Sequence, residues 1–529
     1  MPRQKASPSR LITGVVFVFK LLWSAAVVLV PALGVWFASS LAAYRNGPVW
    51  LVCLCGALLF PVLPLAWDAL AGWRRRRKGA RGPRVLTFWD RLVLRTLTIN
   101  LVFLSALLAR FPAEGFAALS TRGDWFLDGQ QGARVDEARV LLFRAADGLE
   151  WLYVATHENP YESLLGEPEP AGDDDALRPG PTRRPGERPL PQTTKTPEPD
   201  AEPGETGEES SGESPGEESP GEESPAEEPA AGEPDGDALP PWPLPETLHP
   251  LVANMPADVE TSIESVARYI ADNEPVQWRR VKALHDYVAD RVAYDAAAYV
   301  AGRYPPQDAE TVFRSHVAVC AGYARLLAAL GEAAGEEIVV VSGDARNDGA
   351  DVTGEGHAWN AAKLGDFWYL VDATWDAGHV NGDRFTKEYE TGYLFTPPAV
   401  FGVTHFPDEE RWQLRDDPVS RGDFFRQPMM HARFYAEGLE LLSPTRSQVS
   451  VSGALEILVK NPRRRHFLVH AVPKGGGEQR DCEVDAGPSA RFECAFPSAG
   501  TYTVRMFASP KRVGTYAMVG ELEVNAAGS

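Results

Sequence analysis

The chain has 529 residues, long enough for three or four domains, and carries a formal net charge of −21. This acidic balance excludes a typical nucleic-acid-binding protein, which shows a basic face, so no nucleic-acid partner is predicted. Much of the acidity lies in one low-complexity tract, so it says little about the folded parts of the chain.

Residues 1–112 predict an integral membrane anchor. Residues 11–42 are almost wholly apolar apart from Lys20, and about 20 apolar residues are enough to span a bilayer. Residues 49–71 form a second apolar run, and residues 92–108 form a third, weaker one. A cleaved signal peptide would have a shorter apolar region and no further spans after it. We therefore expect two to three transmembrane helices.

Positive charges predict the orientation of this anchor. Basic residues precede the first run, and "RRRRKGARGPR" at 74–84 separates the second run from the third. Basic flanks stay on the cytoplasmic side of the membrane. With three spans, which we favour, the rest of the chain lies outside the cytoplasmic membrane. If the third run is only an interfacial helix, the rest of the chain is cytoplasmic.

Two segments of different composition follow the anchor. Residues 113–165 hold aromatic and apolar clusters such as "GDWFLDG", which suit a small membrane-proximal region without recognisable chemistry. Residues 166–245 contain the degenerate repeat "GEESSGESPGEESPGEESP", whose apolar surface is too small to offset the entropy of ordering. They are predicted to be a disordered Pro/Glu/Gly/Ser-rich linker between anchor and head. An acidic interaction tail is the alternative.

The folded head is predicted to contain two domains. Residues 246–440 begin with segments whose apolar residues recur at helical spacing, and helices then alternate with short strands. Residues 441–529 contain alternating runs such as "HFLVHAV" and "TYTVRMFA", separated by Gly, Pro and basic turns. This pattern predicts an all-β, immunoglobulin-like sandwich of about 80 residues.

Two cysteines of the sandwich are expected to form a disulfide. Cys482 and Cys494 bound the segment "CEVDAGPSARFEC", which has the pattern of a hairpin turning at residues 487–489. A three-residue loop there makes 486 oppose 490, and hence 482 oppose 494. Directly opposite residues can satisfy disulfide geometry. A disulfide suits an exported domain and supports three spans, whereas two buried thiols would suit a cytoplasmic sandwich.

Cys320 is the candidate nucleophile. It lies in "HVAVCAGYARLLAAL", where apolar residues from Tyr323 onward recur at the spacing of a helix that ends near Gly331. Cys320 therefore stands at or near a helix N-terminus, where the positive end of the helix favours the nucleophilic thiolate. Packing is the alternative role, because a free cysteine is also a small buried hydrophobe.

A base and its orienting carboxylate are expected on the segment "GHAWNAAKLGDFWYLVDATW". It has the pattern of two strands joined by a two-residue turn, either at 365–366 or at 364–365. Both registers place His357 and Asp372 on one face, directly opposite or diagonal, within reach of a hydrogen bond. Asp372 would fix the imidazole tautomer, and His357 would take the Cys320 proton. The alternatives are a hydrogen-bonded strand histidine and a strand-end carboxylate.

The remaining histidines and the cofactor motifs add no further chemistry. His316, His379 and His405 are expected to be surface or packing residues. The sequence contains no Cys/His cluster with zinc-ligand spacing, no phosphate-binding Gly-rich loop and no calcium loop, so no metal and no cofactor is predicted.

Three motifs together resemble the transglutaminase-like superfamily of papain-related thiol enzymes. They are "VAYD", "VCAGYARLLAAL" and "GHAWNAAKLGDFWYLVDATWDAG", and the likeness covers about residues 255–400. The family pattern carries a Cys at the start of a helix, a His in "HAW" and an Asp in "DATW", which map onto Cys320, His357 and Asp372. The segment Tyr393–Pro428 resembles the one that follows the core in kyphoscoliosis-peptidase-type proteins. The resemblance implies a papain-like α+β catalytic domain and no calcium-dependent crosslinking.

The sequence thus predicts an α+β protein whose head is a membrane-anchored cysteine peptidase or amidase. A protein or peptide would be its substrate, cleaved through a thioester on Cys320. One alternative is protein-glutamine acyl transfer, which would crosslink proteins. A second is a non-catalytic binding scaffold whose C-terminal β domain docks a partner in the cell envelope.

Overall fold

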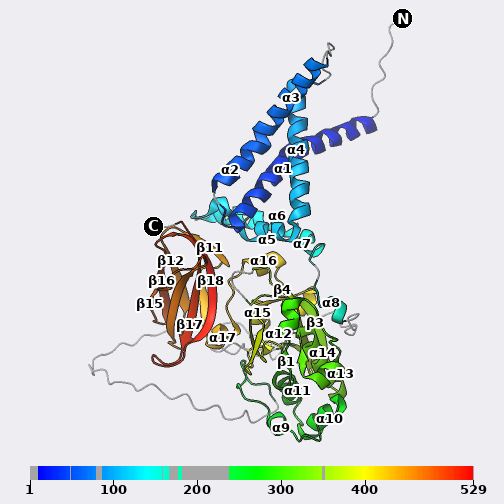
Figure 1. Cartoon of the computed structure of the whole chain (residues 1–529), viewed down its shortest axis with the longest axis vertical. Helices are drawn as coiled ribbons and strands as arrows, with labels where there is room; N and C mark the ends of the chain where they lie inside the picture. Colours follow the sequence, from blue (N-terminus) through cyan, green and yellow to red (C-terminus); the bar gives the residue numbers. More distant parts are fainter. Residues whose placement is uncertain are drawn as a thin grey trace, which may run out of the picture.

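The computed structural model describes residues 10–47, 49–78, 86–130, 132–157, 159–165, 177–180, 238–347 and 352–527. A bundle of long apolar helices stands on a head made of an α/β domain and a β-sandwich (Figure 1). The expected α+β class, with N-terminal apolar helices and C-terminal sheets, is confirmed.

The anchor contains three stretches long and apolar enough to cross a bilayer, which indicates membrane association. They are Ala25–Tyr44, Cys53–Arg77 and Phe88–Arg110. The helices that carry them are α1 (Arg10–Tyr44), α2 (Val49–Ala57), α3 (Leu63–Arg77) and α4 (Phe88–Arg110). Helix α4 corresponds to the weakest of the three apolar runs, and a capping box between Thr87 and Asp90 stabilises its first turn.

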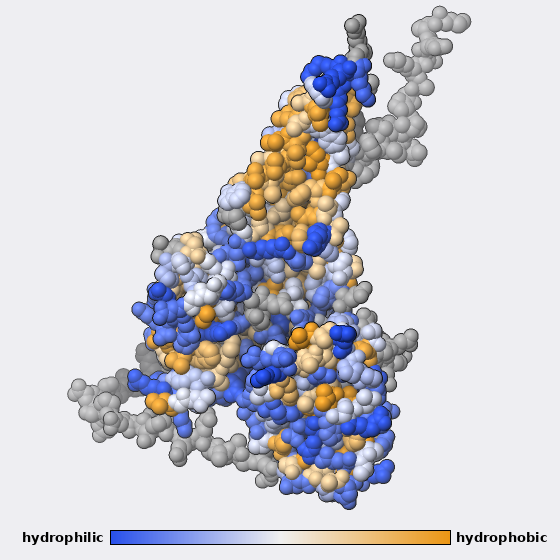
Figure 2. Space-filling view, in the orientation of Figure 1, coloured by the Kyte–Doolittle hydropathy of each residue, from blue (hydrophilic) through white to orange (hydrophobic). Residues whose placement is uncertain are grey.

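The basic segment and the head lie at opposite ends of this bundle. Arg74–Arg77 form the last turn of α3, which runs to the top of Figure 1, away from the head. The other end of the bundle meets the head, where Asn46, just after α1, donates a 3.0 Å hydrogen bond to Thr501 of the sandwich. Figure 2 shows the apolar side chains as a band between these two ends.

Residues 113–165, the expected membrane-proximal region, pack on both the anchor and the head. Their helices are α5 (Pro112–Arg122), α6 (Ala133–Asp147), α7 (Trp151–Val154) and α8 (Glu162–Leu165). In α5, Gly115 lies so close to Phe37 of α1 that a Cβ would come within 2.0 Å of that ring. The next residue, Phe116, packs edge-to-face on Phe425 of the α/β domain, with ring centroids 5.7 Å apart.

The α/β domain starts with helices and continues into an antiparallel sheet. The helices are α9 (Pro250–Ala253), α10 (Ile263–Asn273), α11 (Gln277–Arg291), α12 (Ala296–Ala301), α13 (Ala309–Ser315) and α14 (Cys320–Ala334). The sheet has the order β8-β5-β4-β3-β9, from β3 (Ile338–Ala345), β4 (Glu355–Leu364), β5 (Phe367–Val371), β8 (Leu394–Thr396) and β9 (His405–Pro407).

Smaller elements complete the domain. A parallel pair, β1 (Ala293–Tyr294) and β2 (Val317–Ala318), precedes α14, and a hairpin of β6 (Gly378–Asn381) and β7 (Arg384–Lys387) follows β5. The short helices α15 (Pro398–Phe401), α16 (Arg421–Arg426) and α17 (Ala432–Ala436) lead to the sandwich.

Two apolar clusters hold the sheet of the α/β domain. Helices α10, α11 and α14 pack on one face and bury Leu284 and Leu327 there, and α15 and Trp412 pack on the other face. Side chains of β4 alternate between the faces, so Ala362 joins the first cluster and Ala361 the second. The sheet is thus covered on both sides and forms a rigid base for side chains at the ends of its strands.

Both ends of the acidic spacer rest on the α/β domain. Residues 177–180 pair with Trp368 of β5 through two backbone hydrogen bonds of 2.8 Å. After the spacer, Trp242 and Leu244 are buried in the same domain. These contacts correct the predicted linker 166–245, because its residues 177–180 and 238–245 are part of the folded head. Its other residues, and the disorder expected of them, lie outside the described ranges.

The C-terminal region is the expected sandwich of two sheets. One sheet has the order β10-β12-β16-β15 and the other β11-β18-β17-β13-β14. The first contains β10 (Glu440–Ser443), β12 (Ala454–Lys460), β15 (Glu483–Asp485) and β16 (Ser489–Ala495). The second contains β11 (Gln448–Val451), β13 (His466–Pro473), β14 (Arg480–Asp481), β17 (Ala499–Ser509) and β18 (Ala517–Ala527). Their inward side chains form one core.

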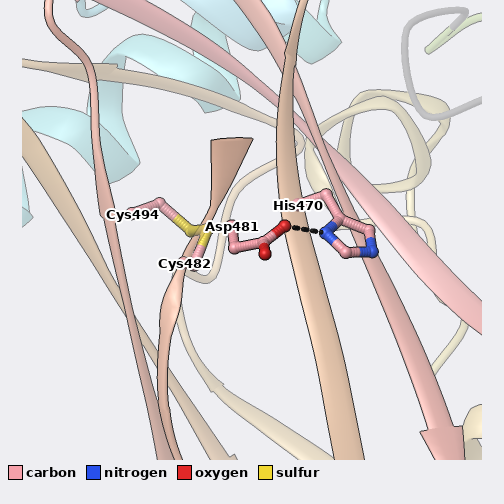
Figure 3. The surroundings of a disulfide bond; sticks show 4 residues. All are labelled: His470, Asp481, Cys482 and Cys494. Carbon is pink, nitrogen blue, oxygen red and sulfur yellow. Dashed lines mark hydrogen bonds and ion pairs between the residues drawn. A yellow bond between two sulfur atoms is a disulfide. The ribbon is translucent and has the colours of Figure 1, made fainter. Parts of the chain in front are cut away.

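A disulfide joins Cys482 to Cys494, with the two Cα atoms 4.4 Å apart. Glu483 pairs with Glu493, so the hairpin register continues to the two cysteines. Figure 3 shows the bond beside a hydrogen bond of 2.8 Å between His470 Nδ1 and the Asp481 carboxylate. The disulfide thus links β16 to the point where the chain passes from β14 in one sheet to β15 in the other.

Replacing both cysteines with alanine is expected to destabilise the sandwich by about 3 kcal/mol, because the closed loop no longer restricts the unfolded chain. Protease sensitivity of residues 441–529 during a temperature ramp should show unfolding about 15 °C earlier. Dithiothreitol should reproduce this shift in the wild type and leave the double variant unchanged. Equal unfolding temperatures for wild type and the double variant would contradict the prediction.

Candidate active site

Cys320 is the first residue of α14 and is buried, with 1% of its surface exposed. The chain enters the helix through the extended Val319, whose N–H donates to Gln307 Oε1 at 2.9 Å. Gly322 has to be small, since a Cβ there would come within 2.6 Å of Gln307 and of Ala318. The thiol is thus held at the positive end of a helix of 15 residues.

His357 and Asp372 are joined by a hydrogen bond of 2.7 Å between Nε2 and Oδ2. The turn between β4 and β5 is at 365–366, the first of the two expected registers, and Gly365 takes its positive φ of 59°. Continuing the pairing of β4 and β5 by one residue beyond Val371 places Asp372 diagonal to His357. The chain bends there, so that the N–H groups of Thr374 and Trp375 donate to Asp372 Oδ1 at 2.8 and 3.3 Å.

The electrostatics favour an ion pair at this site. Burial alone would lower the pKa of His357, but the Asp372 carboxylate and Cys320 outweigh it and raise the pKa to about 10. Burial alone would raise the pKa of Asp372, but His357 and His405 hold it well below its usual range. Cys320 also hydrogen-bonds to His357. Because Nε2 faces Asp372, the ring nitrogen left for the thiol is Nδ1.

His405 is buried beside Asp372, so its expected role as a surface or packing residue needs correction. It lies on the edge strand β9 and reaches across the end of the sheet, with its Nε2 atom 3.1 Å from Asp372 Oδ2. Burial lowers the pKa of His405 to about 4, so its ring is neutral and donates to the carboxylate. Its ring stacks on Phe401 at 4.1 Å. No sequence motif or spacing predicts this contact.

The other two histidines are not part of this hydrogen-bonded cluster. His316 ends α13 in a left-handed conformation with φ of 54°. His379 is exposed on β6 and pairs with Glu388 at 3.3 Å. Neither contributes to the cluster.

A second buried polar network supports the loop after Asp372. Asp376 accepts hydrogen bonds from His285 Nε2 at 3.1 Å and from the Tyr393 N–H at 2.9 Å. Burial raises the pKa of Asp376 to about 6. Burial would lower the pKa of His285, but the carboxylates of Asp286 and Asp376 raise it to about 8. These bonds fix the segment that carries Asp372 and Trp375.

A cavity of about 850 Å³ borders Cys320 and His357. Tyr161, Tyr294 and Trp375 line it near these residues, and Met518 lines it from the sandwich. A peptide would therefore meet the two side chains in a cleft between the domains of the head.

His357, Asp372 and His405 bring three potential metal-ligand atoms within 4.8 Å of one another. The nitrogen–oxygen distances of 2.7 and 3.1 Å are those of hydrogen bonds. Ligands that share one zinc ion in a tetrahedral site stand about 3.3 Å apart. The arrangement fits a hydrogen-bonded histidine–carboxylate–histidine cluster better than a metal site.

The His357 pair predicts a pH-dependent stability. Protonation of His357 stabilises the fold fully below its ordinary pKa of 6.5, and this contribution is lost as the pH rises to about 10. We expect the melting temperature of wild type to exceed that of His357→Gln most at pH 6 and least at pH 10. Differential scanning fluorimetry of both proteins at pH 6, 8 and 10 measures this. A difference that does not change with pH would contradict the prediction.

Comparisons with known proteins agree with the motifs. Residues 264–373, which include Cys320, His357 and Asp372, match the family model of the transglutaminase-like superfamily. The chain is 30% identical over 240 residues to kyphoscoliosis peptidase of Mus musculus and 30% identical over 242 residues to that of Homo sapiens. Each match covers 43% of this chain and 35% of the relative.

One solved structure, described as "Crystal structure of a TGase", shares 20% identity over 26% of this chain and 36% of that chain, with a TM-score of 0.19. The chain spans about a third of the length of the curated relatives that it matches. The expected resemblance to the superfamily and to kyphoscoliosis-peptidase-type proteins is confirmed.

Proposed function

Because residues 264–373 form a domain of the transglutaminase-like superfamily, we propose that this chain is a cysteine peptidase or amidase. Cys320 is the nucleophile, His357 the acid and base, and Asp372 the residue that orients His357. The observation that carries the proposal is the bond of 2.7 Å between buried His357 and Asp372, together with the interaction of Cys320 with the same imidazole.

The proposed reaction has two steps. The Cys320 thiolate attacks the carbonyl carbon of a peptide or amide, and the first N–H groups of α14, which have no partner within the helix, are placed to stabilise the oxyanion. The His357 imidazolium then gives its proton to the leaving amine, and a thioester remains on Cys320. In the second step His357 takes a proton from water, which attacks the thioester and releases the acid.

Each surrounding group supports one part of this cycle. Asp372 accepts four hydrogen bonds and so stays ionised next to the imidazolium. The negative carboxylate keeps the Nε2 proton in place and leaves Nδ1 free to exchange a proton with the sulfur. His405, neutral and buried, helps to hold the carboxylate in this orientation.

Water is the favoured acceptor because two relatives are named peptidases. If a primary amine replaced water, the same thioester would give acyl transfer and crosslinked proteins. A non-catalytic scaffold would need neither the ion pair nor the thiol.

We also propose that the head lies on the extracytoplasmic side. The basic turn Arg74–Arg77 and the head are at opposite ends of the helical bundle, and basic segments stay in the cytoplasm. The disulfide between Cys482 and Cys494 suits an oxidising compartment. Protease added outside intact cells should then degrade the head, and full protection would overturn this orientation.

Alkylation of the full chain in detergent tests the proposed function. Iodoacetamide labelling of the peptide that contains Cys320 should be at least about tenfold slower in His357→Ala than in wild type at pH 7. Equal rates would exclude an activated thiol. Casein as the substrate then distinguishes water from an amine as the acceptor. New α-amino termini report hydrolysis, and incorporation of a fluorescent primary amine reports acyl transfer.

A further inference from the structure

A short segment of the membrane-proximal region lies against Cys320. Residues 159–165, which we call the strap, connect α7 to the spacer and contain the short helix α8. No sequence motif in residues 113–165 carries recognisable chemistry. The position of the strap next to Cys320 nevertheless points to a role in controlling the nucleophile.

Tyr161 of the strap covers the nucleophile. Its side chain is 1% exposed and is packed in one cluster with Val319, Cys320 and Ala321. Its ring lies 5.1 Å from the ring of Tyr304. Burial first, and then the nearby charge of Cys320, raise the pKa of Tyr161 far above its usual range. Tyr161 thus packs beside the thiol at the edge of the cavity.

Hydrogen bonds hold the strap in place on both sides of Tyr161. The Asn159 amide donates to the backbone carbonyls of Gly343 and His357 at 3.0 and 3.3 Å. Downstream, Arg325 of α14 donates to the Leu164 carbonyl at 2.6 Å. The strap is therefore bound to the strand that carries His357 and to the helix that carries Cys320.

Close packing at Gly356 shows how tightly the strap fits. A Cβ on Gly356 would come within 2.6 Å of both Asn159 Oδ1 and Pro160 Cδ. Real Cβ atoms do not approach backbone or ring atoms so closely, so any larger residue at 356 would push the strap away from β4. Gly356 has an ordinary φ, and the substitution would strain only this contact.

Cys320 borders the cavity, but only 1% of its surface is exposed. Attack requires a carbonyl carbon about 3 to 3.5 Å from the sulfur, and with Tyr161 packed in its cluster Cys320 is too enclosed for that approach. We propose that the strap is an autoinhibitory segment that leaves the cleft before a substrate binds. This rests on the proposed function, because it assigns regulation to the same cleft. The strap follows α7 in the chain, which would couple access to Cys320 to the membrane-proximal helices.

Alkylation rates of Cys320 in the full chain in detergent test the strap. We compare wild type, Tyr161→Ala and Gly356→Ala, following the Cys320 peptide by mass spectrometry because Cys53 and Cys55 also carry free thiols. Removing or displacing the strap should raise the rate at least about tenfold, since opening no longer limits access. Tyr161→Phe keeps the ring and Tyr516→Ala lies in the sandwich, and both should label at the wild-type rate.

Rates within twofold of wild type in both Tyr161→Ala and Gly356→Ala would overturn the strap. So would a rise in Tyr161→Ala alone, because it would report local unpacking. Adding His357→Ala to each variant separates this proposal from the proposed function. A fast rate that persists without His357 supports the strap and contradicts the activated thiol. A wild-type rate already as high as that of Tyr161→Ala, and dependent on His357, overturns the strap alone.

Discussion

Asp372→Asn is expected to slow alkylation of Cys320 at pH 7 by at least about 100-fold and amide turnover by about 10³- to 10⁴-fold. The Asp372 carboxylate is a main reason for the raised pKa of His357, and each unit of pKa lost is a tenfold change. An asparagine amide can also donate to Nε2 and select the wrong imidazole tautomer. The thiol then faces a ring that cannot take its proton.

Asp376→Asn is the matched control for this variant. Asp376 is also a fully buried carboxylate, four residues further along, but it binds His285 and the Tyr393 N–H instead of His357. Its substitution should lower stability and leave the alkylation rate within about threefold of wild type. Similar rates in Asp372→Asn and wild type would show that Asp372 has no role in the chemistry. Equal losses in both variants would mean that only folding was affected.

Asp344→Ala is expected to destabilise the α/β domain by about 3 to 5 kcal/mol, which corresponds to roughly 10 °C in melting temperature. Asp344 lies on β3, is 1% exposed and pairs with the buried Arg421 guanidinium. It also lies 2.7 Å from His157, two residues before the strap. Without Asp344 the arginine charge stays buried, and its remaining ion pair among the described residues is with Glu150 at 3.4 Å.

The double variant Asp344→Ala/Arg421→Met separates charge from packing. Arg421 lies over the rings of Tyr153 and Phe406 at 4.8 and 4.5 Å, and methionine can keep much of this apolar contact. Replacing both charges should recover most of the stability lost in the single variant. Thermal melting of the three proteins in one detergent measures this. A double variant less stable than Asp344→Ala would contradict the explanation.

Local patterns predicted the parts of the site that lie close in sequence. The period of two along a strand brought His357 and Asp372 to one face whichever turn was used, and the structure joins them at 2.7 Å. The length of the hairpin loop likewise predicted that Cys482 lies opposite Cys494, and the structure joins the two in a disulfide. Cys320 was found because a helix start is recognisable from the apolar spacing after it.

Contacts between distant segments could not be predicted in this way. His405 reaches Asp372 from an edge strand on the other side of the sheet, and no periodic pattern links the two. Tyr161 and Cys320 are separated in sequence by the whole acidic tract, and no local pattern links residues across it. The ends of the linker could not be predicted either, because Trp242 and Leu244 are isolated apolar residues within a mostly polar stretch.

The spacer leaves the α/β domain near residue 180 and returns to it at 238, so the fold closes it into a loop. For a flexible chain the free-energy cost of closing a loop grows with the logarithm of its length, by about 0.6 kcal/mol for each doubling. Gain or loss of whole Pro-Gly-Glu-Ser units should therefore be almost neutral for stability. Such changes should also leave the contacts of α5 with the anchor and with the α/β domain unchanged.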